Sequence, residues 1–110
     1  MARVSRAIQW IRRDYAEPIR VEALAQKAAM SVSAFHRHFK AVTNLSPLQY
    51  QKRVRLLQAR TLMVASASSV TSAAFEVGYE SATQFSRDYA RVFGLPPARD
   101  TARILAAARG

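Results

Sequence analysis

Residues 21–47 read VEALAQKAAMSVSAFHRHFKAVTNLSP, and residues 70–97 repeat the same pattern as VTSAAFEVGYESATQFSRDYARVFGLPP. The copies align at an offset of 49 at their start and of 50 from Phe35 and Phe85 onward, so the second copy holds one extra residue in its middle. Each copy contains a short stretch with helical spacing of apolar residues, a turn, a second such stretch and a break at proline. The repeat therefore predicts two units, each made of a helix, a tight turn and a second helix.

A helix-turn-helix unit is a common DNA-binding device, in which the second helix enters the major groove. No stretch shows the alternation typical of a strand, so we expect an all-α fold of about seven helices. Two helix-turn-helix subdomains are predicted at residues 1–45 and 66–110, joined by a long connecting helix at 46–65.

The charge of the chain favours a polyanionic partner. Its 110 residues include 17 Lys and Arg against seven Asp and Glu, a net charge of +10. No acidic residue lies between Glu22 and Glu76, although the same segment is rich in Lys and Arg. A basic helix face that only keeps the protein soluble is the alternative, and composition does not separate DNA, RNA, anionic lipid and acidic proteins.

Composition also bears on the compartment. The chain has no cysteine, which excludes disulfides and thiolate metal sites and suits a reducing compartment. No apolar run has the length of a signal peptide or of the roughly 20 residues that a membrane span needs. We expect a soluble, cytoplasmic protein.

The first half of the chain contains three expected helices. The first covers Val4–Ala16 and ends before Pro18, and the second begins at Val21 behind a poor cap. Ser33 is expected to cap the third, which closes at Asn44 in a left-handed conformation. The residues of the third helix expected to face inward are Phe35, Phe39 and Val42. Trp10 is expected either to cover the connecting helix or to meet another domain.

The connecting helix is expected to begin at Ser46-Pro47, a capping hydroxyl followed by a proline suited to the first turn. Its apolar spacing runs through Tyr50, Val54 and Leu57 towards Leu62, and Ser66–Ser69 ends it. In the second copy we expect a helix from Ser69 to Val77, a turn at Gly78 and a helix from Ser81 that Gly94 closes. A short terminal helix follows Pro96-Pro97, with Ile104–Arg109 as a weakly determined tail.

Outward side chains in the first turns of each second helix are the expected contacts with base edges. They are Ser33, His36, Arg37, Ala82, Thr83, Gln84 and Arg87. Arg37 suits a bidentate contact with guanine, or else neutralises phosphate, and Gln84 suits adenine. His36 contacts DNA or is an ordinary surface histidine. The expected contacts with the DNA backbone are Ser31, Lys40, Ser46, Lys52, Arg55, Ser81 and Arg91.

Other chemistry finds little support in the residues. His36 and His38 point about 200° apart on a helix, and no carboxylate lies near them in sequence, so we expect no metal site. We also expect no catalytic residues and no cofactor, because the acidic residues are scattered and no glycine-rich phosphate loop is present. The aromatic residues at helical spacing are expected to form the core rather than stack on bases.

The segments MSVSAFHRHFKAVTNLSPLQYQKRVRLLQAR (residues 30–60) and FEVGYESATQFSRDYARVFGLPP (residues 75–97) resemble the DNA-binding domain of the AraC/XylS family of bacterial transcriptional regulators. The resemblance covers nearly the whole chain. It implies two helix-turn-helix units joined by a rigid helix, an asymmetric DNA site and a role in activating or repressing transcription. Ala29 and Asn44 depart from the family pattern, which commonly has glycine at both positions.

These observations predict a sequence-specific DNA-binding domain whose recognition helices enter successive major-groove segments. Double-stranded DNA is the expected partner, with RNA polymerase and a sensor or dimerisation domain outside this chain as further partners. The alternative is a non-enzymatic basic helical module that binds acidic proteins, membrane surfaces or nucleic acid nonspecifically. The two copies carry different side chains at the outward positions, so an asymmetric site is expected rather than a palindrome.

Overall fold

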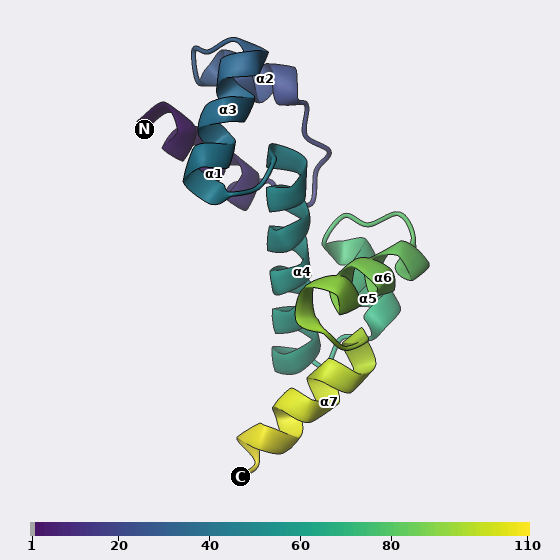
Figure 1. The fold of residues 1–110 in the computed structure, drawn as a ribbon. Helices are drawn as coiled ribbons and strands as arrows, with labels where there is room; N and C mark the ends of the chain where they lie inside the picture. Colours follow the sequence, from purple (N-terminus) through teal and green to yellow (C-terminus); the bar gives the residue numbers. More distant parts are fainter. Residues whose placement is uncertain (1) are drawn as a thin grey trace. The chain divides into compact units, whose positions relative to one another are not determined.

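The computed structural model describes residues 2–110, and Met1, with which the first predicted subdomain begins, lies outside them. The described residues form seven helices and no strand, which confirms the all-α fold. In chain order these are α1 (Ala2–Arg13), α2 (Val21–Lys27), α3 (Val32–Thr43), α4 (Pro47–Ala65), α5 (Val70–Glu76), α6 (Ala82–Phe93) and α7 (Pro97–Ala108) (Figure 1).

The chain divides into two compact units, and the division falls inside α4, between Val54 and Arg55. The predicted connecting helix is therefore one continuous helix of 19 residues whose first turns belong to the first unit and whose last turns belong to the second.

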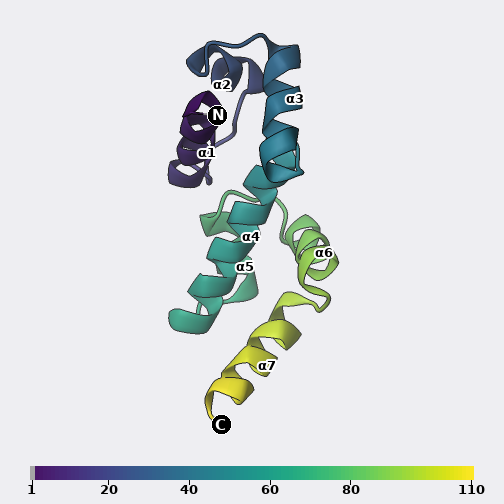
Figure 2. The same ribbon diagram turned by 60° about the vertical axis from the view of Figure 1, so that its left-hand side comes forward.

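The first unit buries an apolar core between α1, α2 and α3, which pack against one another (Figure 2). Phe35 and Phe39 of α3 are fully buried, and the Phe39 ring meets the edge of Tyr50 with 5.6 Å between ring centroids. Such aromatic contacts add to the free energy gained by burying apolar surface. The remaining members of this core are Val4, Ala7, Ile11, Leu24, Ala25 and Ala28.

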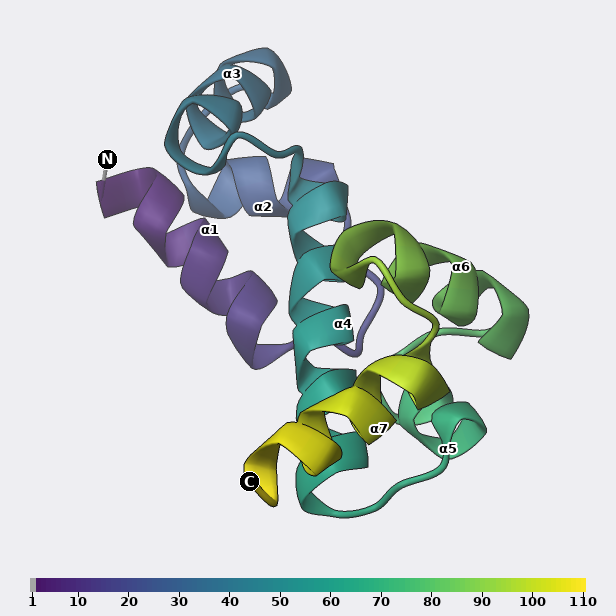
Figure 3. The same cartoon turned by 60° about the horizontal axis from the view of Figure 1, so that its bottom comes forward.

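The second unit packs α6 against α5 and α7 (Figure 3). Phe85 and Tyr89 of α6 are fully buried, and the rings of Tyr79, Phe85, Tyr89 and Phe93 form a continuous series with centroid distances of 5.3, 5.7 and 4.5 Å. The other buried apolar residues of this unit are Leu56, Ala59, Met63, Ala73, Ala74 and Val77.

Asp100 of α7 is a fully buried carboxylate that joins three helices. It accepts hydrogen bonds from the Tyr89 hydroxyl at 2.6 Å, from Arg60 Nε at 3.0 Å and from Arg103 Nη2 at 2.6 Å. Burial by itself raises the pKa of Asp100, but the hydrogen bonds from Tyr89, Arg103 and Arg60 outweigh it and hold that pKa below its ordinary value. Burial, together with Asp100, raises the pKa of Tyr89 to about 12, so the hydroxyl remains a donor.

Left-handed residues end the helices of both units. Ala29 lies in the turn after α2 with φ of 56°, and Gly78 lies in the turn after α5 with φ of 104°. Asn44 and Gly94 close α3 and α6 with φ of 62° and 85°, as expected. The two positions at which the family resemblance implies glycine are thus left-handed here, and Ala29 adopts this conformation at a steric cost.

The prediction that the first helix reaches Ala16 is wrong, because α1 ends at Arg13. The amide of Glu17 donates to the carbonyl of Asp14, which closes a turn. The buried Gln51 side chain then donates to the carbonyls of Tyr15 and Glu17 at 3.1 and 2.6 Å, which holds this segment in a non-helical path.

Two predictions for α3 are also wrong. Ser31, not Ser33, is its cap, since Ser31 Oγ accepts from the amide of Ala34 at 3.2 Å. Val42 is 46% exposed rather than buried. Helical spacing places Val42 on the same side of α3 as Phe39. A residue is buried only where a neighbouring element packs beside it, and Val42 lies in the last turn of the helix.

The expected apolar stripe of α4 differs from the one observed. Leu57 is 45% exposed, whereas Leu56, Ala59 and Met63 are buried. The reason is that the helix serves two cores, so its buried face changes along its length.

The end of the chain is more ordered than its sequence suggests. The segment Ile104–Arg109, expected as a weakly determined tail, is helical as far as Ala108. Its alanines have the highest helix propensity, so the helix extends although this segment is mostly exposed.

Asp100→Asn is expected to lower the free energy of unfolding by about 3 kcal/mol at neutral pH, because it breaks a buried ion pair. Urea unfolding followed by circular dichroism, with hydrogen exchange of the α6 and α7 amides, measures the loss. Asp14→Asn is the matched control and should change stability little, since Asp14 is partly exposed and its ion pair with the exposed Arg13 is long, at 3.5 Å.

The difference between wild type and Asp100→Asn should depend on pH. The pKa of Asp100 is lower in the folded state than its ordinary value of 3.8. Its stabilising effect is therefore complete above that value and is lost as the pH falls through the folded pKa. Equal stability of the two proteins at pH 7 would contradict this role.

Ala29→Gly is expected to raise the free energy of unfolding by about 1 kcal/mol, because glycine adopts a positive φ without steric cost. Denaturant unfolding followed by the fluorescence of Trp10, the one tryptophan in the chain, reports on this unit. Ala23→Gly, in the right-handed interior of α2, should lower stability by about the same amount. A loss of stability in Ala29→Gly would show that the turn is not strained.

Candidate nucleic-acid interface

The second helices of the two units, α3 and α6, are equivalent elements. Each has 12 residues, and their first residues, Val32 and Ala82, are 50 positions apart. Each is capped by a serine that accepts a hydrogen bond from the amide three residues later: Ser31 from Ala34 and Ser81 from Gln84, at 3.2 and 3.1 Å. Side chains along the two helices can therefore be compared position by position.

The predicted base-contacting residues of α3 are all on its exposed side. Ser33, His36 and Arg37 are exposed, and so is Lys40 one turn later. Because Phe35 and Phe39 lie in the core, the helix face on which these four residues lie is fixed as well. The structure thus brings the predicted set together on one helix face.

On α6 the exposed positions are more neutral. Thr83, Gln84 and Arg87 are exposed, whereas Ala82 is only partly so. Arg91 is exposed one turn further on and lies 3.6 Å from the carboxylate of Asp88.

An arginine occupies the equivalent position in each of the two helices. Arg37 is the sixth residue of α3 and Arg87 is the sixth residue of α6, and both are exposed. A guanidinium at this position presents a planar set of donors to whatever lies against the helix, which suits guanine or phosphate.

The predicted contacts with the DNA backbone differ in how they are held. The oxygens of Ser31, Ser46 and Ser81 all accept hydrogen bonds from helix amides, and Ser46 also forms a reciprocal capping pair with Gln49. Amides at such helix starts suit anions such as phosphate. Lys52 is exposed, while Arg55 is partly buried and lies 5.9 Å from the Tyr79 ring centre.

Sequence reasoning missed two features of these helices. Val32 is 41% exposed and is equivalent to Ala82, so it belongs to the outward set of α3. The wrong choice of Ser33 as cap concealed this, although alignment of the two copies contained the signal. Asp88 was also missed. It is almost fully buried in α6, and the residue at the equivalent position of α3 is His38.

Asp88 connects the interior of the second unit to its exposed side. Its Oδ2 accepts from the Tyr79 hydroxyl at 2.9 Å, and its Oδ1 accepts from Gln84 Nε2 at 2.9 Å. Burial, together with this contact to Asp88, raises the pKa of Tyr79, so the hydroxyl stays protonated and continues to donate.

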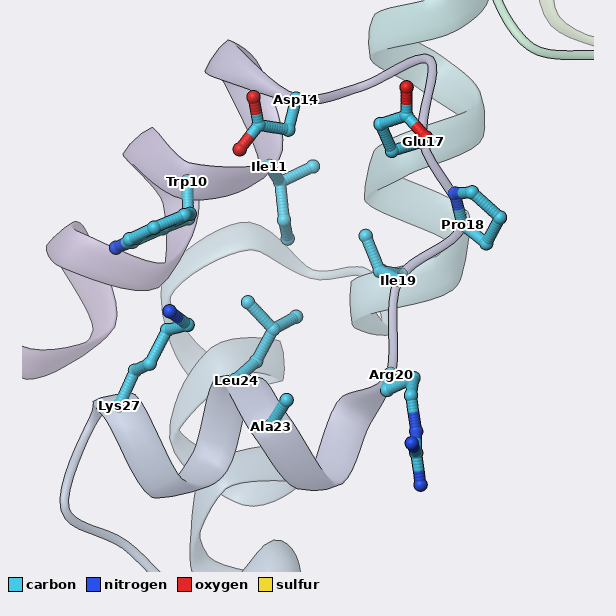
Figure 4. Close-up of a pocket in the computed structure, with 10 residues that line it drawn as sticks. All are labelled: Trp10, Ile11, Asp14, Glu17, Pro18, Ile19, Arg20, Ala23, Leu24 and Lys27. Carbon is cyan, nitrogen blue, oxygen red and sulfur yellow. The ribbon is translucent and has the colours of Figure 1, made fainter.

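Trp10 lies between two cations on the surface of the first unit. Lys27 Nζ is 3.6 Å from its ring centre and Arg13 Cζ is 4.5 Å away. The indole borders a pocket between α1 and α2 that Ile19 and Leu24 also line (Figure 4). The structure sets Trp10 against α2 rather than over the connecting helix, and a contact with another domain stays a prediction.

Other kinds of site find no geometric support. In residues 2–110, no three His, Cys, Asp or Glu side chains are grouped so that they could hold a metal ion. None of the helices described is both long enough and apolar enough to cross a membrane.

Comparison with known proteins agrees with this arrangement. Residues 24–103 match the model of a family described as a helix-turn-helix domain. The HTH-type transcriptional activator RhaS of Escherichia fergusonii is 38% identical over 96 residues, which is 87% of this chain and 34% of RhaS. RhaS of Klebsiella pneumoniae is 35% identical over the same shares. The chain thus spans about a third of the length of the curated relatives that it matches.

Solved structures show the same fold. The DNA-binding domain of AdpA, a global transcriptional factor crystallised in complex with a target DNA, has a TM-score of 0.85 and 32% identity, and the alignment covers 94% of each chain. A probable AraC family transcriptional regulator from Rhodopseudomonas palustris has a TM-score of 0.83 and 30% identity, with 94% of this chain and 97% of that chain covered. With its two helix-turn-helix units, the chain belongs to the AraC/XylS family of transcriptional regulators.

Proposed function

We propose that this chain is the sequence-specific DNA-binding domain of a bacterial transcriptional regulator. In this proposal α3 and α6 enter successive major-groove segments of one duplex. The observation that carries the proposal is the repeated, exposed arginine at the sixth position of both helices, Arg37 and Arg87. The likeness to the AdpA domain, which was crystallised with its target DNA, supports it.

The proposed roles follow from where each side chain lies. Exposed side chains in the first two turns of α3 and α6 read base edges, while helix caps and basic residues near them hold phosphates. The base-reading set is Val32, Ser33, His36, Arg37, Ala82, Thr83, Gln84 and Arg87. The phosphate-binding set is Ser31, Lys40, Ser46, Lys52, Arg55, Ser81 and Arg91.

The two reading helices differ, which favours an asymmetric site. The outward side of α3 carries His36, Arg37 and Lys40, and that of α6 carries Thr83 and Gln84 beside its arginine. A basic set contacts acceptor atoms on bases and phosphates, whereas a threonine methyl and a glutamine amide suit thymine and adenine. One chain would therefore read two different short sequences.

The wider role is proposed by analogy with the relatives. We infer a protein of the bacterial cytoplasm and nucleoid that regulates transcription, with RNA polymerase and a sensor or dimerisation domain as further partners. The matched relatives are described as transcriptional activators. Catalysis has no part in this proposal.

Selection of bound sequences from a random duplex library at physiological salt tests the proposal. We expect a long, asymmetric motif with two clusters of fixed bases about one helical turn apart. Equal binding to all duplexes would instead support the alternative, a basic module that binds nucleic acid nonspecifically. A motif with one short cluster would mean that only one of the two helices contacts bases.

Arg37→Ala and Arg87→Ala should each relax base preference in a different cluster of the selected motif. Loss of a bidentate contact costs about 1–3 kcal/mol of discrimination, roughly five-fold to more than one hundred-fold in relative affinity. Repeating the selection with each variant measures the change. Arg13→Ala, on the exposed side of α1, is the control and should leave both clusters intact. Uniform weakening over all sequences would instead make Arg37 and Arg87 phosphate contacts.

Lys52→Ala should weaken binding to every duplex alike and reduce the slope of log K against log salt by about 0.9, because one phosphate contact is lost. Fluorescence anisotropy titrations between about 50 and 200 mM salt measure this slope. Lys52→Arg keeps the charge and should keep the slope. A changed base preference in Lys52→Ala would contradict its role as a backbone contact.

A further inference from the structure

The Gln84 side chain is exposed on α6, yet one end of it is tied to a buried group. Gln84 Nε2 donates to Asp88 Oδ1 at 2.9 Å, one helical turn further along. Asp88 itself is 3% exposed and is held by the Tyr79 hydroxyl at 2.9 Å, with Arg91 at 3.6 Å. The partner that orients Gln84 is thus fixed by the core of the second unit.

The chemistry of this pair decides which way the amide points. A carboxylate has only acceptors, so the nitrogen of the Gln84 amide must face Asp88 and the oxygen must lie at the other end. An amide beside a group that both donates and accepts would have no such preference. The orientation of the Gln84 amide therefore follows from the fact that Asp88 offers acceptors and no donor.

We propose that Asp88 is a positioning residue that holds the Gln84 amide with its oxygen towards DNA, so that Gln84 selects adenine or cytosine over guanine or thymine. This inference rests on the proposed function. In the major groove, adenine and cytosine present an exocyclic amine, which donates, whereas guanine and thymine present carbonyl oxygens at the corresponding places. An outward amide oxygen accepts from the first pair and is repelled by the second.

The first unit has no counterpart of this pair. Ala34 and His38 occupy the places of Gln84 and Asp88 in α3, 50 positions earlier. Selection of a base by an oriented amide therefore belongs to α6 alone. It gives this helix, whose exposed side is the more neutral, a source of specificity that needs no charged side chain at the base.

The test combines sequence selection with base analogues. Gln84→Met, which removes both ends of the amide at similar length, locates the base that Gln84 reads. In the wild type that base should be adenine or cytosine. Replacing it by purine or by pyrimidin-2-one, which lack only the exocyclic amine, should weaken wild-type binding about tenfold and leave Gln84→Met unaffected.

Asp88→Asn should admit guanine or thymine at this position, because an asparagine amide accepts or donates and no longer fixes Gln84. Tyr79→Phe is the matched control: it removes a hydrogen bond to Asp88 but leaves the carboxylate that faces Gln84, so the base preference should persist. Thermal unfolding followed by circular dichroism confirms which variants are folded, and the analogue experiment on wild type stands if Asp88→Asn does not fold.

Three results would overturn the inference. They are a wild-type preference for guanine or thymine at the position that Gln84→Met affects, an unchanged preference in folded Asp88→Asn, and no position affected by Gln84→Met. Each leaves the reading by Arg37 and Arg87 intact. If the wild type selects no sequence at all, the proposed function fails instead, so the two failures are distinguishable.

Discussion

A carboxylate removed from water must be given hydrogen-bond donors, and at Asp100 this requirement organises the second unit. Arg60 of α4, Tyr89 of α6 and Arg103 of α7 meet there, and the Arg60 guanidinium also lies 3.9 Å from the Phe93 ring centre. Since Tyr89 is in the middle of the buried face of α6, the same network fixes how that helix is rotated. The exposed direction of Thr83, Gln84 and Arg87 follows from this rotation.

The first unit fixes α3 in a different way, although its chain follows the same pattern. Phe39 stands in the place of Tyr89 and Tyr50 in the place of Asp100, so apolar ring packing replaces the ionic network. Arg12 Nε donates to the Tyr50 hydroxyl at 2.9 Å at the edge of this core. At this pair of positions the first unit thus uses ring packing and the second a polar network.

The two solutions have different consequences for recognition. In α3 the exposed set is mostly basic, with His36, Arg37 and Lys40, which suits strong but less directional contacts with DNA. In α6 the buried Asp88 holds one outward side chain by a directional hydrogen bond. In the proposed mode of recognition, specificity in the second unit draws on the rigidity of its interior, because an orienting group is useful only when it does not move itself.

Sequence alone determined the all-α fold, the two helix-turn-helix units and most of the exposed positions of α3 and α6, because helical periodicity, the capping serine of α6 and left-handed Asn44 and Gly94 are local signals. It did not predict the end of α1, the exposure of Val42 or the buried face of α4, since these depend on Gln51 and on which elements lie alongside. Nor did it reveal that Asp88 and Asp100 are buried. Only the tertiary structure decided this, because a carboxylate is buried when distant Tyr79, Tyr89 and Arg60 supply its donors.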